Sequence, residues 1–251
     1  MSIRNIKLIV QYDGSRYRGW QIQPGKRTIQ GELVEALSNL VGVRTQVHGA
    51  SRTDAGVSAL GQVALFEIDS PIPTENLPKA INGRLPRDIV VTAAEEVTPK
   101  FDLLGDVKSK LYRYTIYTGR YRHVLRLSQC WHIPKKLDVK AMNQAAQLLI
   151  GTKDFKSFAS AADKREKTVR TIFRCDVTRG QASENDWIYV NVEGDGFLYN
   201  MVRNIVGTLV EVGVGRWRPE KINEILEAKN RTAAGRLAPA QGLCLMWIKY
   251  A

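Results

Sequence analysis

The chain has 251 residues, of which 44% are hydrophobic and 25% charged, the composition of a folded protein with one large domain or two small ones. These proportions exclude disordered, collagen-like and disulfide-rich secreted proteins, and no apolar run reaches the roughly 18 residues that a transmembrane helix needs. The N-terminus leads directly into a strand-like segment without the features of a signal peptide, so we expect a cytoplasmic protein with no membrane partner.

The first half of the chain is predicted to follow the order β-α-β-β-α-β. A helix is predicted to begin after Thr28, an acceptable N-cap, because apolar residues from Ile29 to Leu40 recur every three or four positions. The other predicted elements are a short helix over 74–82 and strands over 6–12, 43–48, 62–68 and 89–97.

The second half repeats this order with one additional helix. Asp138 is a predicted N-cap for a helix that runs through Ile150 and is stopped by Gly151. The other predicted elements are strands over 110–118, 168–177, 187–193 and 243–250, and helices over 197–212 and 219–228.

The repeat indicates an α+β fold made of two tandem ferredoxin-like halves, with domains at 1–107 and 108–251. Each half is expected to form an antiparallel sheet covered by helices on its outer face. The two uncovered faces would then form a central cleft.

The charge is concentrated in the second half. The net charge is +12; residues 1–107 hold 12 basic and 12 acidic side chains, whereas residues 108–251 hold 25 and 13. From Lys108 to Lys136 there are eight basic residues and no acid, interleaved with four tyrosines and Trp131. A solvated cationic face is one interpretation, but aromatic rings among cations favour single-stranded or looped RNA as the partner.

Two segments carry candidate functional side chains. The long loop from Gly49 to Gly61 holds one carboxylate, Asp54, close to Arg52, as a catalytic loop held between strands would. The alternative is an Asx-type turn in which Asp54 bonds its own backbone. In the apolar helix 197–212, Arg203 requires an acidic partner or a phosphate unless its side chain extends to solvent.

These segments resemble the tRNA pseudouridine synthase A (TruA) family, and the resemblance runs almost end to end. The family's signature RTDAGV is present as Arg52–Val57, and its YDGxxYxGWQ segment as Tyr12–Gln21. Further matches are NGRLP at 82–86, YRY at 112–114, DFKSF at 154–158, the MVRNIVG helix at 201–207 and the closing Gly242-Leu243.

The resemblance implies an isomerase that converts uridine to pseudouridine in the anticodon stem-loop of tRNA, at tRNA positions 38, 39 and 40. It implies no cofactor, no metal and a homodimer that binds tRNA. It further implies that Asp54 is the catalytic nucleophile, that Arg203 pairs with this carboxylate, that Tyr112 contacts the target base, and that Arg52 is linked to base flipping.

Physical chemistry supports these roles independently. The bond from uracil N1 to ribose C1′ must break and C5 must bond to C1′, so a carboxylate next to the electron-poor sugar carbon is suitable. Arg203 would lower the pKa of Asp54 and fix its rotamer. Tyr112 could hold the extruded base while Arg52 fills the vacated space. Whether the carboxylate bonds to C1′ or promotes a glycal route stays open.

Two departures from the family pattern affect RNA contacts. Ser58 stands where the family has a histidine after RTDAGV, and the linker 101–107 lacks the family's basic residues. Two other functions stay open: a synthase of the same superfamily that modifies other RNA uridines, and a catalytically silent RNA-binding protein of this fold.

Overall fold

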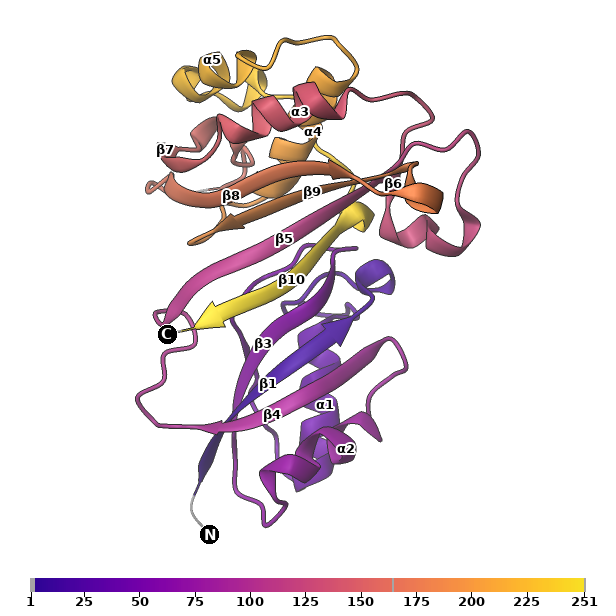
Figure 1. Ribbon diagram of the computed structural model, residues 1–251. Coiled ribbons are helices and arrows are strands. Elements are labelled where there is room, and N and C mark those ends of the chain that lie inside the picture. Colours follow the sequence, from indigo (N-terminus) through magenta and orange to yellow (C-terminus); the bar gives the residue numbers. More distant parts are fainter. Residues whose placement is uncertain (1–2, 164, 251) are drawn as a thin grey trace. The chain divides into compact units, whose positions relative to one another are not determined.

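The computed structural model describes residues 3–163 and 165–250 and divides the chain into two compact units (Figure 1). The first unit comprises Met1–Lys108 with Leu245–Ala251, and the second comprises Ser109–Cys244. The C-terminal segment thus groups with the first unit, although the sequence analysis placed it in the second domain. Its side chains Ile248 and Tyr250 pack on a cluster that includes Val63.

The α+β class is confirmed, since α-helices accompany strands that are mostly antiparallel. The ferredoxin-like arrangement of each half and the central cleft stay predictions. In the first half the elements are β1 Arg4–Tyr12, α1 Ile29–Val41, β2 His48–Gly49, β3 Ser58–Ile68, α2 Leu77–Asn82 and β4 Ile89–Val97. In the second they are β5 Val107–Tyr117, β6 Trp131–His132, α3 Val139–Gln147, β7 Gly151–Asp154, β8 Val169–Arg179, β9 Trp187–Gly194, α4 Met201–Gly213, α5 Lys221–Ala228 and β10 Leu243–Tyr250.

In the first unit, β1 lies between β3 and β4 and is antiparallel to both. Alternate residues of β1 are buried, and Leu8 pairs with Ala64 of β3. Helices α1 and α2 contribute Leu33, Leu37 and Ile81 to the core, because apolar residues at helical spacing share one face.

The N-cap of α1 is the predicted Thr28, and its C-cap is Gly42. The Thr28 hydroxyl accepts a hydrogen bond from Gly31 N, and Gly42 ends the helix in the left-handed conformation with φ of 78°.

The predicted strand over 43–48 is wrong except at its end, where β2 pairs His48 and Gly49 with β3. Two side chains of α1 bind the backbone of this segment instead. Gln30 Nε2 donates to the Val47 carbonyl at 2.7 Å, and Ser38 Oγ accepts from Thr45 N at 3.1 Å. These bonds use backbone groups that a strand ladder needs.

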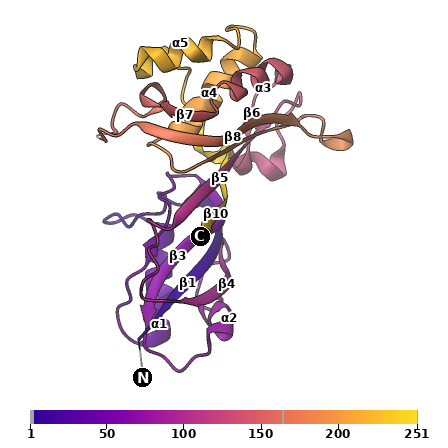
Figure 2. The same ribbon diagram turned by 60° about the vertical axis from the view of Figure 1, so that its left-hand side comes forward.

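In the second unit, the strand order is β5-β9-β8-β7, with antiparallel neighbours, and β6 pairs parallel with β5. Helix α3 packs on β8, and α4 packs on α3. Figures 1 and 2 show α3, α4 and α5 on the same side of these strands.

Two predicted helix boundaries in this unit need correction. Helix α4 begins at Met201 rather than at 197, because Asn200 has a left-handed φ of 62° that interrupts the helix. Helix α3 ends at Gln147, and Gly151, with φ of 103°, begins strand β7, which the sequence analysis missed. Segment 197–200 is therefore an irregular turn that leads into α4.

Within residues 3–163 and 165–250, none of the helices has the length and apolar character that crossing a bilayer requires.

Candidate functional site

The first group of candidate residues lies on a loop of the first unit, just before β3. Residues 54–57 form a turn in which Val57 N donates to the Asp54 carbonyl at 3.1 Å. Gly56, the third residue of the turn, has φ of 81°, the positive angle that a type II turn requires there. Asp54 is half-buried and Arg52 is exposed.

The Tyr12–Gln21 segment holds this loop through its backbone. Trp20 N donates to the Thr53 carbonyl at 3.0 Å, and Gly56 N donates to the Tyr17 carbonyl at 3.3 Å. A Cβ atom on Gly19 would stand 2.6 Å from the Thr53 carbonyl oxygen, and one on Gly14 would overlap the Val57 carbonyl. Both motifs of the first half therefore belong to one structure, in which two glycines allow backbone to touch backbone.

Buried side chains fix the same loop from its other end. The hydroxyls of Tyr12 and Thr53 are hydrogen-bonded at 2.8 Å. Gln62 of β3 donates from Nε2 to the Ser51 carbonyl at 2.6 Å and accepts from Ser51 N at 3.1 Å. The residues before Asp54 are thus held on both sides, so the backbone position from which its carboxylate extends is fixed.

Ser58 also takes part in this arrangement. Its hydroxyl accepts a hydrogen bond from Gly14 N at 3.1 Å. The linker 101–107 also has a structural role: the Phe101 ring contacts the Tyr250 ring at a tilt, with ring centroids 5.0 Å apart, and Leu103 is buried.

Arg52 differs from the rest of the loop. Its side chain is exposed, whereas Thr53 next to it is buried. An exposed cation next to a half-buried carboxylate is available for contact with an incoming anion or base.

The second group of candidate residues lies in the second unit. Tyr112 of β5 pairs with Val192 of β9, is 6% exposed, and meets the Phe197 ring edge-on at a centroid distance of 5.3 Å. Phe197 belongs to the irregular turn before α4. That turn therefore contacts Tyr112 at one end and begins the helix of Arg203 at the other.

Arg203, in the first turn of α4, has its guanidinium oriented by two acceptors. Nε donates to the Ala238 carbonyl at 2.8 Å, and Nη1 donates to Asn200 Oδ1 at 3.0 Å. The backbone of segment 236–238 comes this close because residue 207 is glycine, where a Cβ would overlap the Arg236 carbonyl.

Tyr114 of β5 supports the residue that directly follows this segment. Its hydroxyl donates to the Pro239 carbonyl at 2.7 Å. Burial raises the pKa of Tyr114 and is the larger effect, while the nearby positive charge of Arg203 acts in the opposite direction. Tyr114 is thus a neutral, buried support next to the Arg203 charge.

The structure places Arg52 with Asp54 on one loop of the first unit, and links Tyr112 to Arg203 through one turn of the second. Sequence reasoning missed the supporting residues Tyr12, Gln62 and Asn200. Tyr12 lies within the first motif and Asn200 lies only three residues before Arg203, so their positions could have indicated them, whereas the contacts of Gln62 depend on tertiary packing.

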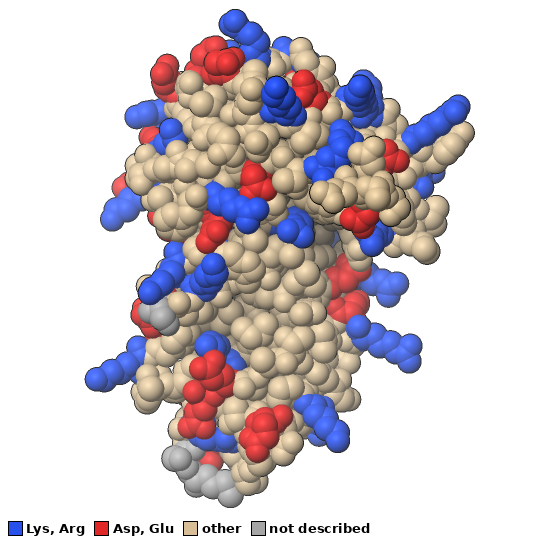
Figure 3. All heavy atoms as spheres, in the orientation of Figure 1, with Lys and Arg blue, Asp and Glu red and all other residues tan. Residues whose placement is uncertain are grey.

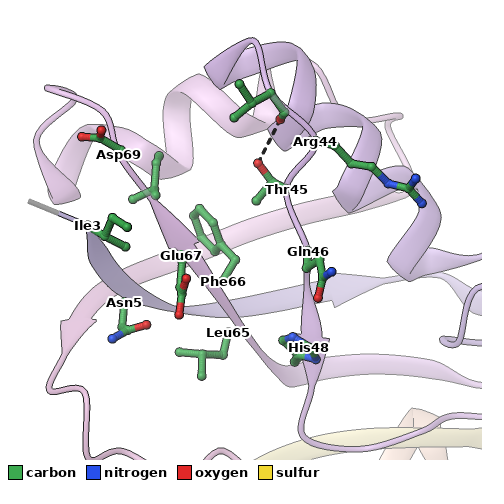
Figure 4. A pocket seen from close by; sticks show the side chains of 12 residues that line it. Ile3, Asn5, Arg44, Thr45, Gln46, His48, Leu65, Phe66, Glu67 and Asp69 are labelled. Atoms are coloured by element: carbon green, nitrogen blue, oxygen red, sulfur yellow. Dashed lines mark hydrogen bonds between the residues drawn. The ribbon is translucent and has the colours of Figure 1, made fainter.

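Among the described residues, no group of three or more His, Cys, Asp or Glu side chains is placed to hold a metal ion. A pocket of 530 Å³ lies elsewhere in the first unit, between segment 43–48 and the end of β3 (Figure 4). It is lined by residues of mixed charge, including Arg44, His48, Glu67 and Asp69. None of the four predicted site residues lines it.

Comparison with known proteins identifies the family. A family model described as tRNA pseudouridine synthase matches residues 8–103 and 145–251. The chain therefore belongs to the tRNA pseudouridine synthase family.

Within that family the chain is similar to proteins named tRNA pseudouridine synthase A, which confirms the predicted resemblance. The relative from Caldicellulosiruptor saccharolyticus is 42% identical over 99% of this chain and 100% of its own length. Those from Acetivibrio thermocellus and Anoxybacillus flavithermus are 43% and 45% identical, each over 99% of this chain and 100% and 99% of their own lengths.

Similarity to solved structures is weak. The structure of an H/ACA RNP bound to a substrate RNA containing 2'-deoxyuridine has a TM-score of 0.32 and 11% identity, over 82% of this chain and 53% of that chain. The assignment rests on the family model and the curated relatives alone.

Proposed function

We propose that the protein isomerises uridine to pseudouridine in the anticodon stem-loop of tRNA, at tRNA positions 38, 39 and 40, with Asp54 as the nucleophile. Membership of the family makes it an isomerase that acts on tRNA uridines. The observation that carries the role of Asp54 is its place in a turn fixed by Trp20, Thr53 and Gly56.

The reaction is balanced within the nucleotide. The N1–C1′ bond breaks, the uracil ring rotates while it stays in the site, the C5–C1′ bond forms, and C5 loses its proton as N1 gains one. No water is consumed, so one carboxylate next to C1′ suffices, unlike the pair that a glycosidase uses. A carboxylate held by a rigid turn needs little reorganisation to reach the sugar carbon.

The other three residues are assigned roles around this carboxylate. Arg203 would pair with Asp54, keep it ionised and fix its direction, for which the two hydrogen bonds that orient its guanidinium are suitable. Tyr112, supported edge-on by Phe197, would contact the target base. Arg52, exposed on the same loop as Asp54, would occupy the space that the flipped base leaves.

We further propose that the protein works as a cytoplasmic homodimer that binds tRNA mainly through phosphate contacts. Light scattering tests the dimer directly, since a dimer has twice the chain mass of 28.2 kDa. A monomer at working concentration would contradict it.

The substitution Asp54→Asn tests the catalytic role. We expect turnover on a tRNA transcript to fall below about 1% of the wild-type value while tRNA affinity stays within about tenfold, because the shape of the loop remains and phosphate contacts dominate binding. Asp69→Asn, which removes an exposed acid of the same unit, is the matched control and should leave turnover unchanged.

Turnover of Asp54→Asn above a few per cent would contradict the proposal. Activity of the wild type on another RNA but not on tRNA would favour the wider superfamily function. Tight tRNA binding without any pseudouridine formation would favour the silent RNA-binding protein.

A further inference from the structure

An acidic side chain outside the predicted site connects a surface loop of the second unit to the turn before α4. Asp163 has a side chain that is only 6% exposed. Its Oδ2 accepts a hydrogen bond from Tyr199 N at 2.8 Å, and its backbone N donates to the Ser160 carbonyl at 2.9 Å. Ser160 N in turn donates to the Tyr199 carbonyl at 2.9 Å, so the loop and the turn are joined twice.

Arg165 reinforces this connection as a planar fork. Its Nε and Nη2 donate to the two oxygens of Asp163 at 2.9 and 2.6 Å, and its Nη1 donates to the Phe197 carbonyl at 3.3 Å. The guanidinium lowers the pKa of Asp163 well below its usual range, so this carboxylate is ionised at any working pH. We call the three residues Asp163, Arg165 and Tyr199 the latch.

The turn that the latch holds carries two side chains that contact predicted site residues. Phe197 meets the Tyr112 ring edge-on at 5.3 Å, and Asn200 accepts from Arg203 at 3.0 Å. Tyr199, whose backbone binds Asp163, lies between them in the chain. Asn200 has positive φ, a left-handed conformation that asparagine adopts more readily than other non-glycine residues.

We propose that Asp163 is a positioning residue for pseudouridine formation, which sets the places of Tyr112 and Arg203 by holding the 197–200 turn. The inference rests on the proposed function. Asp163 touches neither the reacting atoms nor the RNA in this account. It acts on the step in which the base rotates and C5 reaches C1′, because misplacement of supporting groups by about an ångström costs catalytic rate more than binding.

The test compares Asp163→Ala with Asp138→Ala on a tRNA transcript. Asp138 also accepts a backbone N–H, from Ala141 at 3.0 Å, but it caps α3 away from the turn, so its replacement is a control for a missing carboxylate. We expect Asp163→Ala to lower kcat at least about fivefold with tRNA affinity within about twofold, and Asp138→Ala to leave kcat unchanged.

Two further variants separate positioning from a general structural role. Asp163→Asn keeps an oxygen that can accept from Tyr199 N, so it should retain more activity than Asp163→Ala and serves if the alanine variant does not fold. In an Arg203→Lys background, adding Asp163→Ala should lower kcat by a smaller factor than in the wild type, because the part of its effect that acts through Arg203 is already lost.

Wild-type kcat in folded Asp163→Ala would overturn the inference, and so would an equal fold-loss in the wild-type and Arg203→Lys backgrounds or a loss confined to tRNA affinity. A different result would show that the proposed function itself is wrong. In that case the wild type and Asp138→Ala themselves form no pseudouridine in tRNA.

Discussion

At the scale of single residues, the position of Asp54 depends on glycines, which have no functional group of their own. Gly19 has φ of 90°, and a methyl group there would also press on the Thr53 carbonyl. Gly56 supplies the positive φ of the turn itself. The family motifs around the aspartate are therefore conformational requirements as much as chemical ones.

The substitution Gly19→Ala tests this directly. It is expected to destabilise the protein by more than about 1 kcal/mol and to lower turnover, because it adds both backbone strain and a collision with the loop that holds Asp54. Thermal unfolding and turnover are measured together.

Gly42→Ala is the matched control, since Gly42 has φ of 78° but a Cβ there meets nothing within 4 Å. It should cost stability alone. Equal turnover in the two variants would show that the contact at Gly19 does not shape the site.

Arg203→Lys separates the enzyme from a phosphate-binding module. Lysine keeps the charge but loses the planar fork, so we expect turnover to fall at least about tenfold, or roughly 1.4 kcal/mol of transition-state stabilisation, with little change in tRNA affinity. Steady-state kinetics and a binding titration with the same transcript give both quantities.

Arg174→Lys, in an exposed arginine of β8 that pairs with Asp176 elsewhere in the second unit, is the control. If lysine at 203 supports turnover as well as arginine does, Arg203 is a simple charge rather than the partner of a carboxylate.

At the scale of elements, α4 is built to accept a close neighbour. Gly207 lies one turn after Arg203, and segment 236–238 passes against it, which brings the Ala238 carbonyl to Arg203 Nε. Glu211, another turn on, lies within 3.8 Å of Arg236. One face of the helix thus holds the segment that orients the arginine.

The substitution Gly207→Ala tests this close packing, because the direction of the change in stability depends on whether the new methyl group has room. In an ordinary helix interior alanine is more stable than glycine by about 0.5–1 kcal/mol. Here we expect destabilisation and lower turnover, because the new methyl group would overlap the Arg236 carbonyl. A rise in melting temperature with unchanged turnover would contradict the close packing.

The sequence predicts elements well where local signals and packing agree. β4 and β10 have the predicted bounds, and α1 has its predicted N-cap, because alternation, helical spacing and a capping threonine all act within a few residues. Segment 43–48 is not a strand before His48, since side chains of the preceding helix, Gln30 and Ser38, bind its backbone.

The residues of the candidate site differ in the same way, because some are marked by local signals and others only by tertiary contacts. Asp54 and Arg203 could be singled out from motifs and from an arginine in an apolar helix. The contacts that fix them could be predicted only in part: Asn200 lies three residues before Arg203 and is a local partner, whereas Gln62 and Asp163 become neighbours of the site only through tertiary folding.

At the scale of the whole molecule, the excess positive charge is the main indication of an RNA partner. On the face shown in Figure 3, Lys and Arg side chains are spread among acidic ones and do not form a single patch. The run after β5 combines exposed aromatic and cationic groups: Tyr121 is 73% exposed, and the Arg120 guanidinium lies over its ring at 5.3 Å. Aromatic and cationic side chains together are suited to single-stranded RNA.

Salt dependence tests whether this run binds tRNA. Replacing Arg120, Arg122 and Arg126 together with Gln should flatten the plot of log affinity against log salt, by about 0.7 to 0.9 for each phosphate that is no longer neutralised. The matched control replaces Lys79, Arg84 and Arg87, which are exposed in the first unit. An unchanged slope in the first variant, or an equal change in both, would show that the run does not face the RNA.

Pseudouridine formation in the anticodon stem-loop of tRNA is the activity that we propose for this chain. The direct measurement is to incubate the purified protein with an unmodified tRNA transcript, without added metal or cofactor, and to map pseudouridine nucleotide by nucleotide. We predict pseudouridine at positions 38, 39 or 40 with the wild type and none with Asp54→Asn. Pseudouridine only outside the anticodon stem-loop, or equal amounts with Asp54→Asn, would contradict the account.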